Sequence, residues 1–166
     1  MSKSRGNVVD PDEMVKKFGS DSVRLYLCFM GPYENGGPWD PKAIIGVYRF
    51  LNRVWNLIAN SKKRIANSGE NKELNKTFNK AIKKIGEDIE NLKFNTAVSE
   101  LMKLLNEIEK KELSKNQLEI FLKLLAPFAP HITDELWHQI GNKNSIHLVK
   151  WPEYDSKLIQ EEMVDL

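Results

Sequence analysis

The sequence has a single cysteine, Cys28, among its 166 residues, and it has no long apolar run. One thiol excludes an internal disulfide framework and a zinc site built from clustered cysteines. Without about 18 consecutive apolar residues, a membrane-spanning helix is not expected, and the N-terminus lacks the apolar run of a signal peptide. The net charge is also small, +2 at pH 7. These absences predict a cytoplasmic protein with no membrane partner.

The small net charge hides an uneven distribution along the chain. Residues 42–84 contain eleven Lys and Arg against two Asp and Glu, whereas residues 85–166 contain nine against fifteen. A basic segment of this kind favours a polyanionic partner such as nucleic acid. The alternative is a lysine-rich helix surface that is only solvated, and charge alone leaves both interpretations open.

Strand-like alternation is nearly absent from the chain, and apolar residues recur at helical spacing instead. Asp10-Pro11 and Asp40-Pro41 each place a capping carboxylate before a proline, and Gly19 suits a helix end. Residues 146–151 are the one short segment expected to be extended. Helices are expected over about 11–18, 20–30, 41–66, 73–90, 94–111, 115–126 and 131–141. The predicted fold class is all-α, a bundle of four or five main helices with a short loop-and-helix lead.

The N-terminal residues Met1-Ser2-Lys3-Ser4 place a lysine between hydroxyl side chains. A polar loop of this composition can donate hydrogen bonds to phosphate. These four residues resemble the end of the KMSKS signature of class I aminoacyl-tRNA synthetases. Residues 125–137, LAPFAPHITDELW, resemble the closing helix of the anticodon-binding domain in the leucine, isoleucine and valine branch. Two motifs in family order are more specific than either motif alone.

Four further segments are similar to the bacterial-type leucyl-tRNA synthetase family: FMGPY at 29–33, GGPW at 36–39, GVYRFLNRVW at 46–55 and WPEYD at 151–155. The resemblance therefore extends over essentially the whole chain. Two alternatives stay open. One is an isoleucyl or valyl member of the same branch, and the other is a non-catalytic helical module that binds a protein partner.

The resemblance implies an enzyme that joins leucine to its tRNA with ATP and magnesium, through an adenylate. Lys3, helped by Ser2 and Ser4, would contact the ATP phosphates and stabilise the charge that develops on the leaving pyrophosphate. The family's other signature, HIGH, is absent from this sequence. We therefore expect a fragment that binds leucine tRNA weakly and catalyses nothing. Its partners would include the catalytic and C-terminal domains of the same enzyme.

Within such a fragment, residues 1–40 would form the KMSKS loop and connecting helices, and residues 41–166 the anticodon-binding bundle. If the helices expected over 41–66 and 73–90 are neighbours, their polar faces would make one cationic strip. Such a strip would contact the tRNA backbone without reading bases. The expected RNA-contact residues are Arg49, Arg53, Lys62, Lys63, Arg64, Lys76, Lys80, Lys83 and Lys84.

Other reactive side chains are expected to have structural roles. His131, Glu135 and His138 share one helical face and have the residue types of a zinc site, but the resemblance implies no metal there. Cys28 lies in an apolar helix and is expected to be a small buried hydrophobe rather than a nucleophile. Trp55 falls on the apolar face of the helix expected over 41–66, so it is expected in the core.

Overall fold

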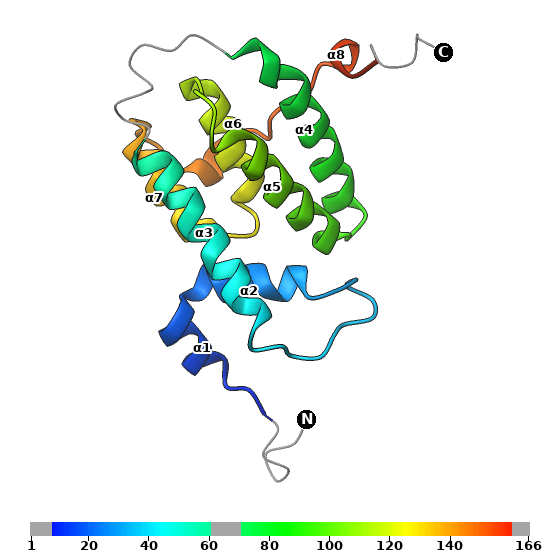
Figure 1. Ribbon diagram of the computed structural model, residues 1–166, viewed down its shortest axis with the longest axis vertical. Coiled ribbons are helices and arrows are strands. Elements are labelled where there is room, and N and C mark those ends of the chain that lie inside the picture. The colour runs from blue at the N-terminus through cyan, green and yellow to red at the C-terminus, as the bar shows by residue number, and fades with distance from the viewer. Residues whose placement is uncertain (1–7, 61–70, 161–166) are drawn as a thin grey trace.

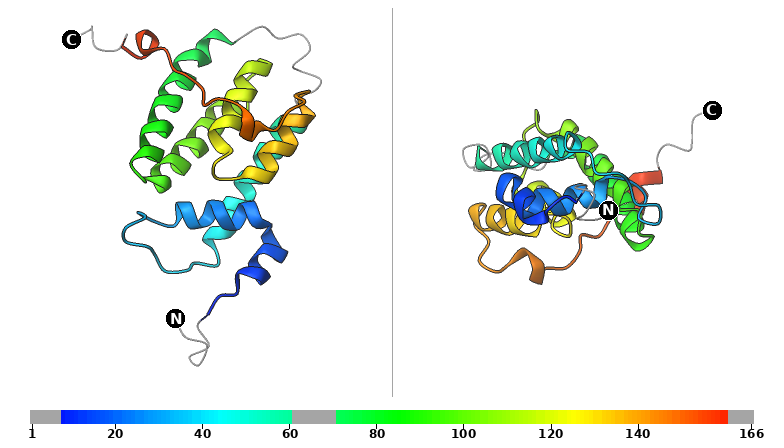
Figure 2. Two further views of the ribbon diagram at one scale, coloured as in Figure 1. Left: turned by 180° about the vertical axis from the view of Figure 1, so that it is seen from behind. Right: turned by 90° about the horizontal axis from the view of Figure 1, so that it is seen from below.

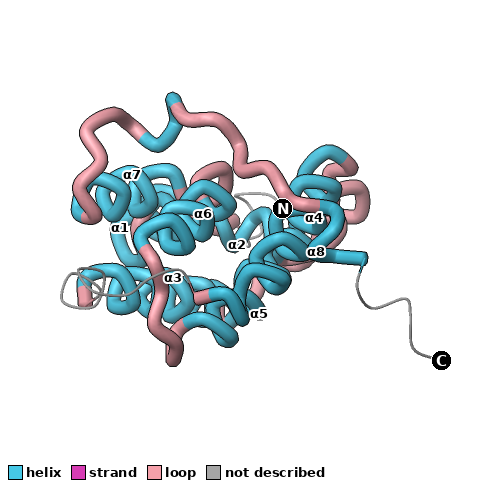
Figure 3. Tube along the Cα trace, turned by 90° about the horizontal axis from the view of Figure 1, so that it is seen from above, coloured by secondary structure: helices cyan, strands magenta, loops and turns pink. Residues whose placement is uncertain are grey.

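The computed structural model describes residues 8–60 and 71–160, and within these ranges it consists of helices and loops with no strand (Figure 3). The predicted all-α class is confirmed. No helix in the described part of the chain has the length and apolar character that crossing a membrane requires. In chain order the elements are α1 (Pro11–Phe18), α2 (Ser20–Phe29), α3 (Ala43–Ala59), the 3₁₀ turn η3 (Lys72–Leu74), α4 (Asn75–Glu90), α5 (Phe94–Ile108), α6 (Lys115–Leu125), α7 (Pro130–Gln139), the 3₁₀ turn η4 (Ile146–Leu148) and α8 (Ser156–Gln160).

The ends of α1 follow from local chemistry that the sequence already indicated. The Asp10 side chain accepts a hydrogen bond from the backbone N–H of Asp12 at 2.9 Å, and Pro11 occupies the first helical position. Gly19 ends the helix at φ +84°, a conformation that a residue with a Cβ rarely adopts. α2 starts at once, so α1 and α2, which together form the N-terminal lead to the bundle, are joined by one residue.

Two elements of the structure differ from those expected from the sequence. α3 begins at Ala43 and ends at Ala59, with Asn60 as its C-cap, and residues 61–66 of the expected helix lie outside the described residues. The expectation of an extended segment at 146–151 was wrong at its start, because Ile146–Leu148 form a 3₁₀ turn. The Ser145 hydroxyl accepts a hydrogen bond from the His147 N–H at 3.3 Å. With no neighbouring strand to pair with, the backbone of this segment is satisfied by a local turn.

The helices of the bundle surround α6. In Figure 1, α5 and α6 occupy the middle, α3 and α7 lie on one side and α4 on the other. α4 packs along α5, α6 packs on α7, and α3 contacts α7. α2 lies across one end of the bundle, where it contacts α3, α5 and α7, and α1 extends beyond it.

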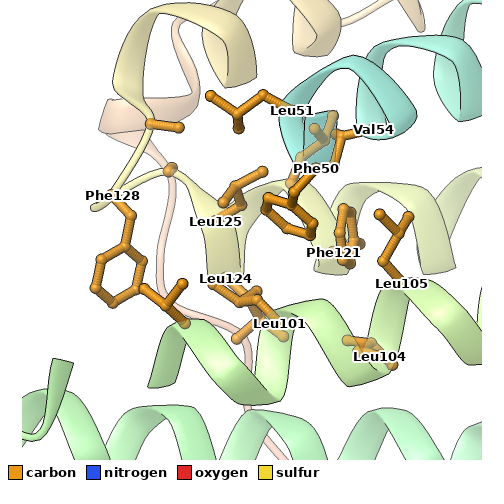
Figure 4. Close-up of a cluster of buried hydrophobic side chains, with 14 of the residues drawn as sticks. Phe50, Leu51, Val54, Leu101, Leu104, Leu105, Phe121, Leu124, Leu125 and Phe128 are labelled. Atoms are coloured by element: carbon orange, nitrogen blue, oxygen red, sulfur yellow. The ribbon is translucent and has the colours of Figure 1, made fainter. Parts of the chain in front are cut away.

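The core joins side chains from α3, α5 and α6 (Figure 4). Phe50 and Val54 of α3 point toward Phe121 of α6, and Leu101 and Leu105 of α5 close the other side. All five are at most 3% exposed. α6 has a wide apolar face, whereas Lys115, Asn116, Glu119 and Lys123 lie on its other side. This explains its central place, because a wide apolar face must be covered by more than one neighbouring helix. Its residues Leu118, Phe121, Leu122, Leu124 and Leu125 have no exposed surface.

Gln117 connects the start of α6 to the start of α4. Its N–H bonds to the Ser114 hydroxyl at 3.2 Å, and its Oε1 accepts from the Ser114 N–H at 3.1 Å, which completes a capping box. Its Nε2 donates to the Asn71 carbonyl at 2.8 Å and to Asn75 Oδ1 at 3.3 Å. Gln117 is 1% exposed, so one buried amide joins the start of α6 to Asn75, the first residue of α4, which lies 42 positions earlier in the chain.

Replacement of Gln117 by Ala should destabilise the fold by about 1–3 kcal/mol, because it removes the cap of α6 and leaves the polar groups at the start of α4 without their buried partner. Urea unfolding followed by circular dichroism would measure the change. Gln139→Ala is the matched control, since its amide bonds Glu135 at the surface, and its effect should stay within about 0.5 kcal/mol. Equal stability of the two variants would contradict this account.

Candidate functional site

Six of the residues predicted to bind ATP or RNA lie outside the described residues. They are Ser2, Lys3 and Ser4 of the N-terminal motif, and Lys62, Lys63 and Arg64 after α3. Their roles stay predictions. The other six predicted RNA contacts lie on α3 (Arg49, Arg53) and on α4 (Lys76, Lys80, Lys83, Lys84).

The two basic groups do not form the single strip that was expected of neighbouring helices. α4 packs along α5, whereas α3 packs on α2 and α7, and α5 lies between them (Figure 3). The C-terminal end of α5 and its C-cap residue Glu109 are acidic where they face these groups. Glu109 Oε2 lies 2.9 Å from Arg53 Nη2, and Glu107 Oε2 accepts a hydrogen bond from the Thr77 hydroxyl of α4 at 3.3 Å. Carboxylates therefore interrupt the path between the two groups.

Several of these cations are neutralised locally. Arg53 also donates to Asn106 Oδ1 at 2.6 Å, so its guanidinium is held against α5. On α4, Lys84 contacts both oxygens of Asp88, at 2.5 and 2.7 Å, and the Asp88 carboxylate is buried. Lys83 lies 3.9 Å from Glu87. Arg49 is exposed and takes part in no ion pair within the described ranges, so its charge is the more available for a phosphate.

The residues considered for zinc have other partners. His131 Nδ1 lies 2.8 Å from Asp21 Oδ1, and His138 Nδ1 lies 2.9 Å from the Asn142 carbonyl oxygen. Glu135 accepts a hydrogen bond from Gln139. Among the residues that the structure describes, no group of three His, Cys, Asp or Glu side chains is arranged to hold a metal ion.

The expectation of a core position for Trp55 was wrong, since its side chain is 37% exposed. Core residues of α3 are Val47, Leu51 and Val54, and each next residue lies about 100° further round the helix. Trp55 therefore falls beside the core stripe, as does Tyr48, which is 41% exposed. The two aromatic side chains line a shallow hollow between α3 and the α2–α7 junction.

The junction of α2 and α7 depends on Asp21, which sequence analysis did not single out. Asp21 Oδ2 accepts from the backbone N–H of Ile132 at 2.7 Å, and Oδ1 faces His131 at 2.8 Å. Ile132 is in the first turn of α7, whose N-cap residue, Ala129, has no side chain that can accept a hydrogen bond. Asp21, 7% exposed, caps α7 from 111 residues away, and its negative charge lies at the positive end of the helix. The missing cap at Ala129 was the signal that could have pointed to such a partner.

Arg24 adds a second contact between α2 and the α6–α7 connection. Its Nη2 donates to the Pro127 carbonyl at 3.3 Å. One turn further along α2, burial raises the pKa of the Cys28 thiol, and the nearby Arg24 charge opposes this effect. A raised pKa disfavours the thiolate, which is consistent with Cys28 as a packing residue.

Asp134 anchors the C-terminal segment to α7. Its Oδ1 accepts from the Ser145 hydroxyl at 2.8 Å and from the Ile146 N–H at 2.9 Å. These hydrogen bonds, first that of Ser145 and then that of Ile146, lower the pKa of the carboxyl below its ordinary value, and His138 and His147 lower it further. The carboxylate form therefore fixes the turn that precedes residues 149–155.

Comparison with known families assigns the bundle. A family model described as the anticodon-binding domain of tRNA ligase matches residues 71–166, more than half of the chain. The chain belongs to this anticodon-binding domain family. A second family model, described as tRNA synthetases class I (I, L, M and V), matches residues 1–37.

Relatives of this anticodon-binding chain are leucine–tRNA ligases, and they confirm the predicted resemblance. That of Herpetosiphon aurantiacus is 42% identical over 174 aligned residues, which cover 100% of this chain and 21% of the relative. That of Borrelia garinii subsp. bavariensis is 48% identical over 163 residues, 96% of this chain and 19% of the relative. The chain thus spans about a fifth of the length of the curated relatives it matches.

A solved structure gives the same result. The agnB2 LeuRS of Agrobacterium radiobacter K84, crystallised as a ternary complex with tRNA and LeuAMS, superposes with a TM-score of 0.84 at 32% identity. The match covers 96% of this chain and 23% of that chain.

Asp21 lies in the range that matches class I synthetases, 1–37, and Ile132 lies in the bundle matched over 71–166. The hydrogen bond between them therefore connects the two matched parts of the anticodon-binding domain chain.

Replacement of Asp21 by Ala should destabilise the domain by about 2–3 kcal/mol, because α7 loses its cap and a largely buried polar contact is broken. Asp21→Asn should cost less, since its amide oxygen can still accept from Ile132. Urea unfolding would compare both with Glu34→Gln, an exposed loop change expected to stay within about 0.5 kcal/mol. Unchanged stability in Asp21→Ala would rule out the capping role.

The lowered pKa of Asp134 predicts a pH dependence of stability. Its carboxylate is stabilised in the folded state, so this contribution is present above the unfolded value of about 3.9 and is lost as the pH falls through the lower folded value. The stability difference between the wild-type chain and Asp134→Asn should therefore shrink below about pH 4. Urea unfolding of both chains between about pH 3 and about pH 6 would show this, and a difference independent of pH would contradict it.

Proposed function

We propose that this chain is the tRNA-binding helical part of a leucine–tRNA ligase. The observation that carries the proposal is the match of the bundle, residues 71–166, to the anticodon-binding domain of tRNA ligases. Leucine is assigned because the curated leucine–tRNA ligases resemble the whole chain rather than the bundle alone. The solved neighbour is a complex that includes tRNA, which supports tRNA as the partner.

The whole enzyme would attach leucine to its tRNA, first by forming the adenylate from ATP and then by transferring the leucyl group. Lys3, with Ser2 and Ser4, would stabilise the triphosphate in the first step as negative charge builds on the leaving pyrophosphate. The match of residues 1–37 to class I synthetases supports this assignment. The bundle itself would bind and position the tRNA.

The α2–α7 junction would hold the N-terminal segment in a fixed position relative to the helices that bind the tRNA. α2 follows the N-terminal motif by way of α1, and Asp21 and Arg24 fix it to the start of α7 and to the α6–α7 connection. Because α2 also packs on α3 and α5, the lead is held from several sides. A tRNA bound to the helices would thus be placed at a defined position relative to the segment that leads to Lys3.

Basic side chains on the helices would contact phosphates. Arg49 is the best placed of the predicted residues on α3, since it is exposed and Arg53 is already paired with Glu109. Lys76 and Lys80 contribute positive charge on α4. Contacts of this kind position RNA without reading its sequence.

Fluorescence anisotropy with purified leucine tRNA at about 50 and about 200 mM salt tests the proposal. With about four phosphate contacts, affinity should fall roughly 100-fold between these conditions, because each contact releases a counterion. Arg49→Gln should reduce the slope of log affinity against log salt by about 1. Lys103→Gln, which removes an exposed charge on α5 next to Glu100, is the matched control and should leave the slope unchanged.

Isoleucine tRNA provides the specificity control. A preference for leucine tRNA would show that this domain contributes to identity, and equal binding of both would leave discrimination to other parts of the enzyme. No binding at the lower salt concentration would contradict a tRNA-binding function for the chain.

A further inference from the structure

A second basic surface lies on the face formed by α6, α7 and the segment that follows them. In the left panel of Figure 2, the C-terminal segment crosses this face on its way from η4 to α8 beside α4. A hollow of about 190 Å³ lies there, and its lining holds three basic residues, Lys123, His147 and Lys150, and no carboxylate. Ligand pockets for drug-sized molecules are about 300–1,000 Å³, so this hollow suits a single small group.

The basic side chains are held at the hollow by neighbouring groups. Lys123 Nζ lies 5.6 Å from the centre of the Trp137 ring, a cation–π contact that keeps the ammonium at the surface. His147 Nε2 lies 3.2 Å from the Pro130 carbonyl oxygen, which only accepts hydrogen bonds, so Nε2 carries the proton. Arg24, which donates to the Pro127 carbonyl, adds a further positive charge next to the lining residue Pro127.

Trp151 forms one wall of the hollow and separates it from an acidic groove. A Cβ at Gly86 of α4 would lie 3.5 Å from Trp151 Nε1, so the nitrogen edge of the indole packs against α4. The side chain is nevertheless 40% exposed. On its other side lies a groove lined by Glu87, Glu90 and Glu153 together with Lys83, and the excess of negative charge there would repel phosphate. The charge distribution therefore directs an anionic ligand to the side of Lys123 and Lys150.

We propose that this hollow is a second RNA-contact site, in which Lys123 and Lys150 bind a backbone phosphate and an unpaired base of the tRNA stacks on Trp151. Proteins that bind single-stranded RNA combine positive charge for the backbone with aromatic rings on which bases stack, and this hollow offers both. This proposal rests on the proposed tRNA-binding function and adds a surface that the predicted residues on α3 and α4 do not include.

Anisotropy with leucine tRNA and the double variant Lys123→Gln/Lys150→Gln tests the phosphate contact. Affinity at about 50 mM salt should fall about 10-fold, and the salt slope should fall by about 2. Lys110→Gln/Lys111→Gln is the matched control, because it removes the same charge from the exposed turn before α6, whereas Lys123 is near the end of that helix. This control should bind within about twofold of the wild-type chain.

Trp151→Leu and Trp151→Phe test the stacking contact. The Leu variant should bind at least about fivefold more weakly, whereas the Phe variant should keep most of the affinity, since every aromatic ring offers a stacking face. Urea unfolding of both variants would show that the comparison concerns folded protein. If the wild-type chain does not bind tRNA, the proposed function and this site both fail. The site alone is overturned if the wild-type chain binds tRNA but the Lys123→Gln/Lys150→Gln variant binds as tightly as its control. The same holds if Trp151→Leu and Trp151→Phe bind with equal affinity.

Discussion

The contact on which the arrangement of the chain most depends is the carboxylate of Asp21 at the start of α7. α7 follows Ala129 and begins with a proline, so its first turn has backbone donors and no local acceptor. Asp21 supplies that acceptor only if α2 lies across the end of the bundle. Capping of α7 and docking of the lead are therefore one event, and an N-terminal segment without Asp21 would lose its strongest polar attachment to the helices.

The distribution of charge in space differs from its distribution along the sequence. The central segment is rich in lysine and arginine, yet Arg53 is paired with Glu109 and Lys84 with Asp88. The last half of the chain has an excess of acidic residues, yet it forms a hollow lined by Lys123, His147 and Lys150 without a carboxylate. Net charge over a segment averages groups that face different sides, so it identifies a nucleic-acid protein better than it locates the contact surface.

Much of the fold could be predicted because it is encoded locally. The Asp10-Pro11 pair, Gly19 and the apolar spacing of α4 to α7 fix most helix positions to within a few residues. The prediction for Trp55 was wrong because this residue lies at the edge of the wide apolar face of α3. The spacing of apolar residues does not show which edge of such a face a neighbouring helix covers. The 3₁₀ turn at Ile146 was missed because its apolar alternation resembles that of a strand. The Asp21–Ile132 bond joins residues 111 positions apart, and no local pattern predicts such a pair.

The α6–α7 connection brings these features together. Its residue Pro127 accepts a hydrogen bond from Arg24 of α2 and also lines the basic hollow. Three residues later α7 begins, and His147, which also lines the hollow, bonds the carbonyl of Pro130. An RNA bound in the hollow would therefore touch the same short connection that holds the lead. Arg24 and Pro127 are both exposed, so a bound RNA would lie directly beside the hydrogen bond that joins α2 to this connection, and the same residues would serve the lead and the RNA.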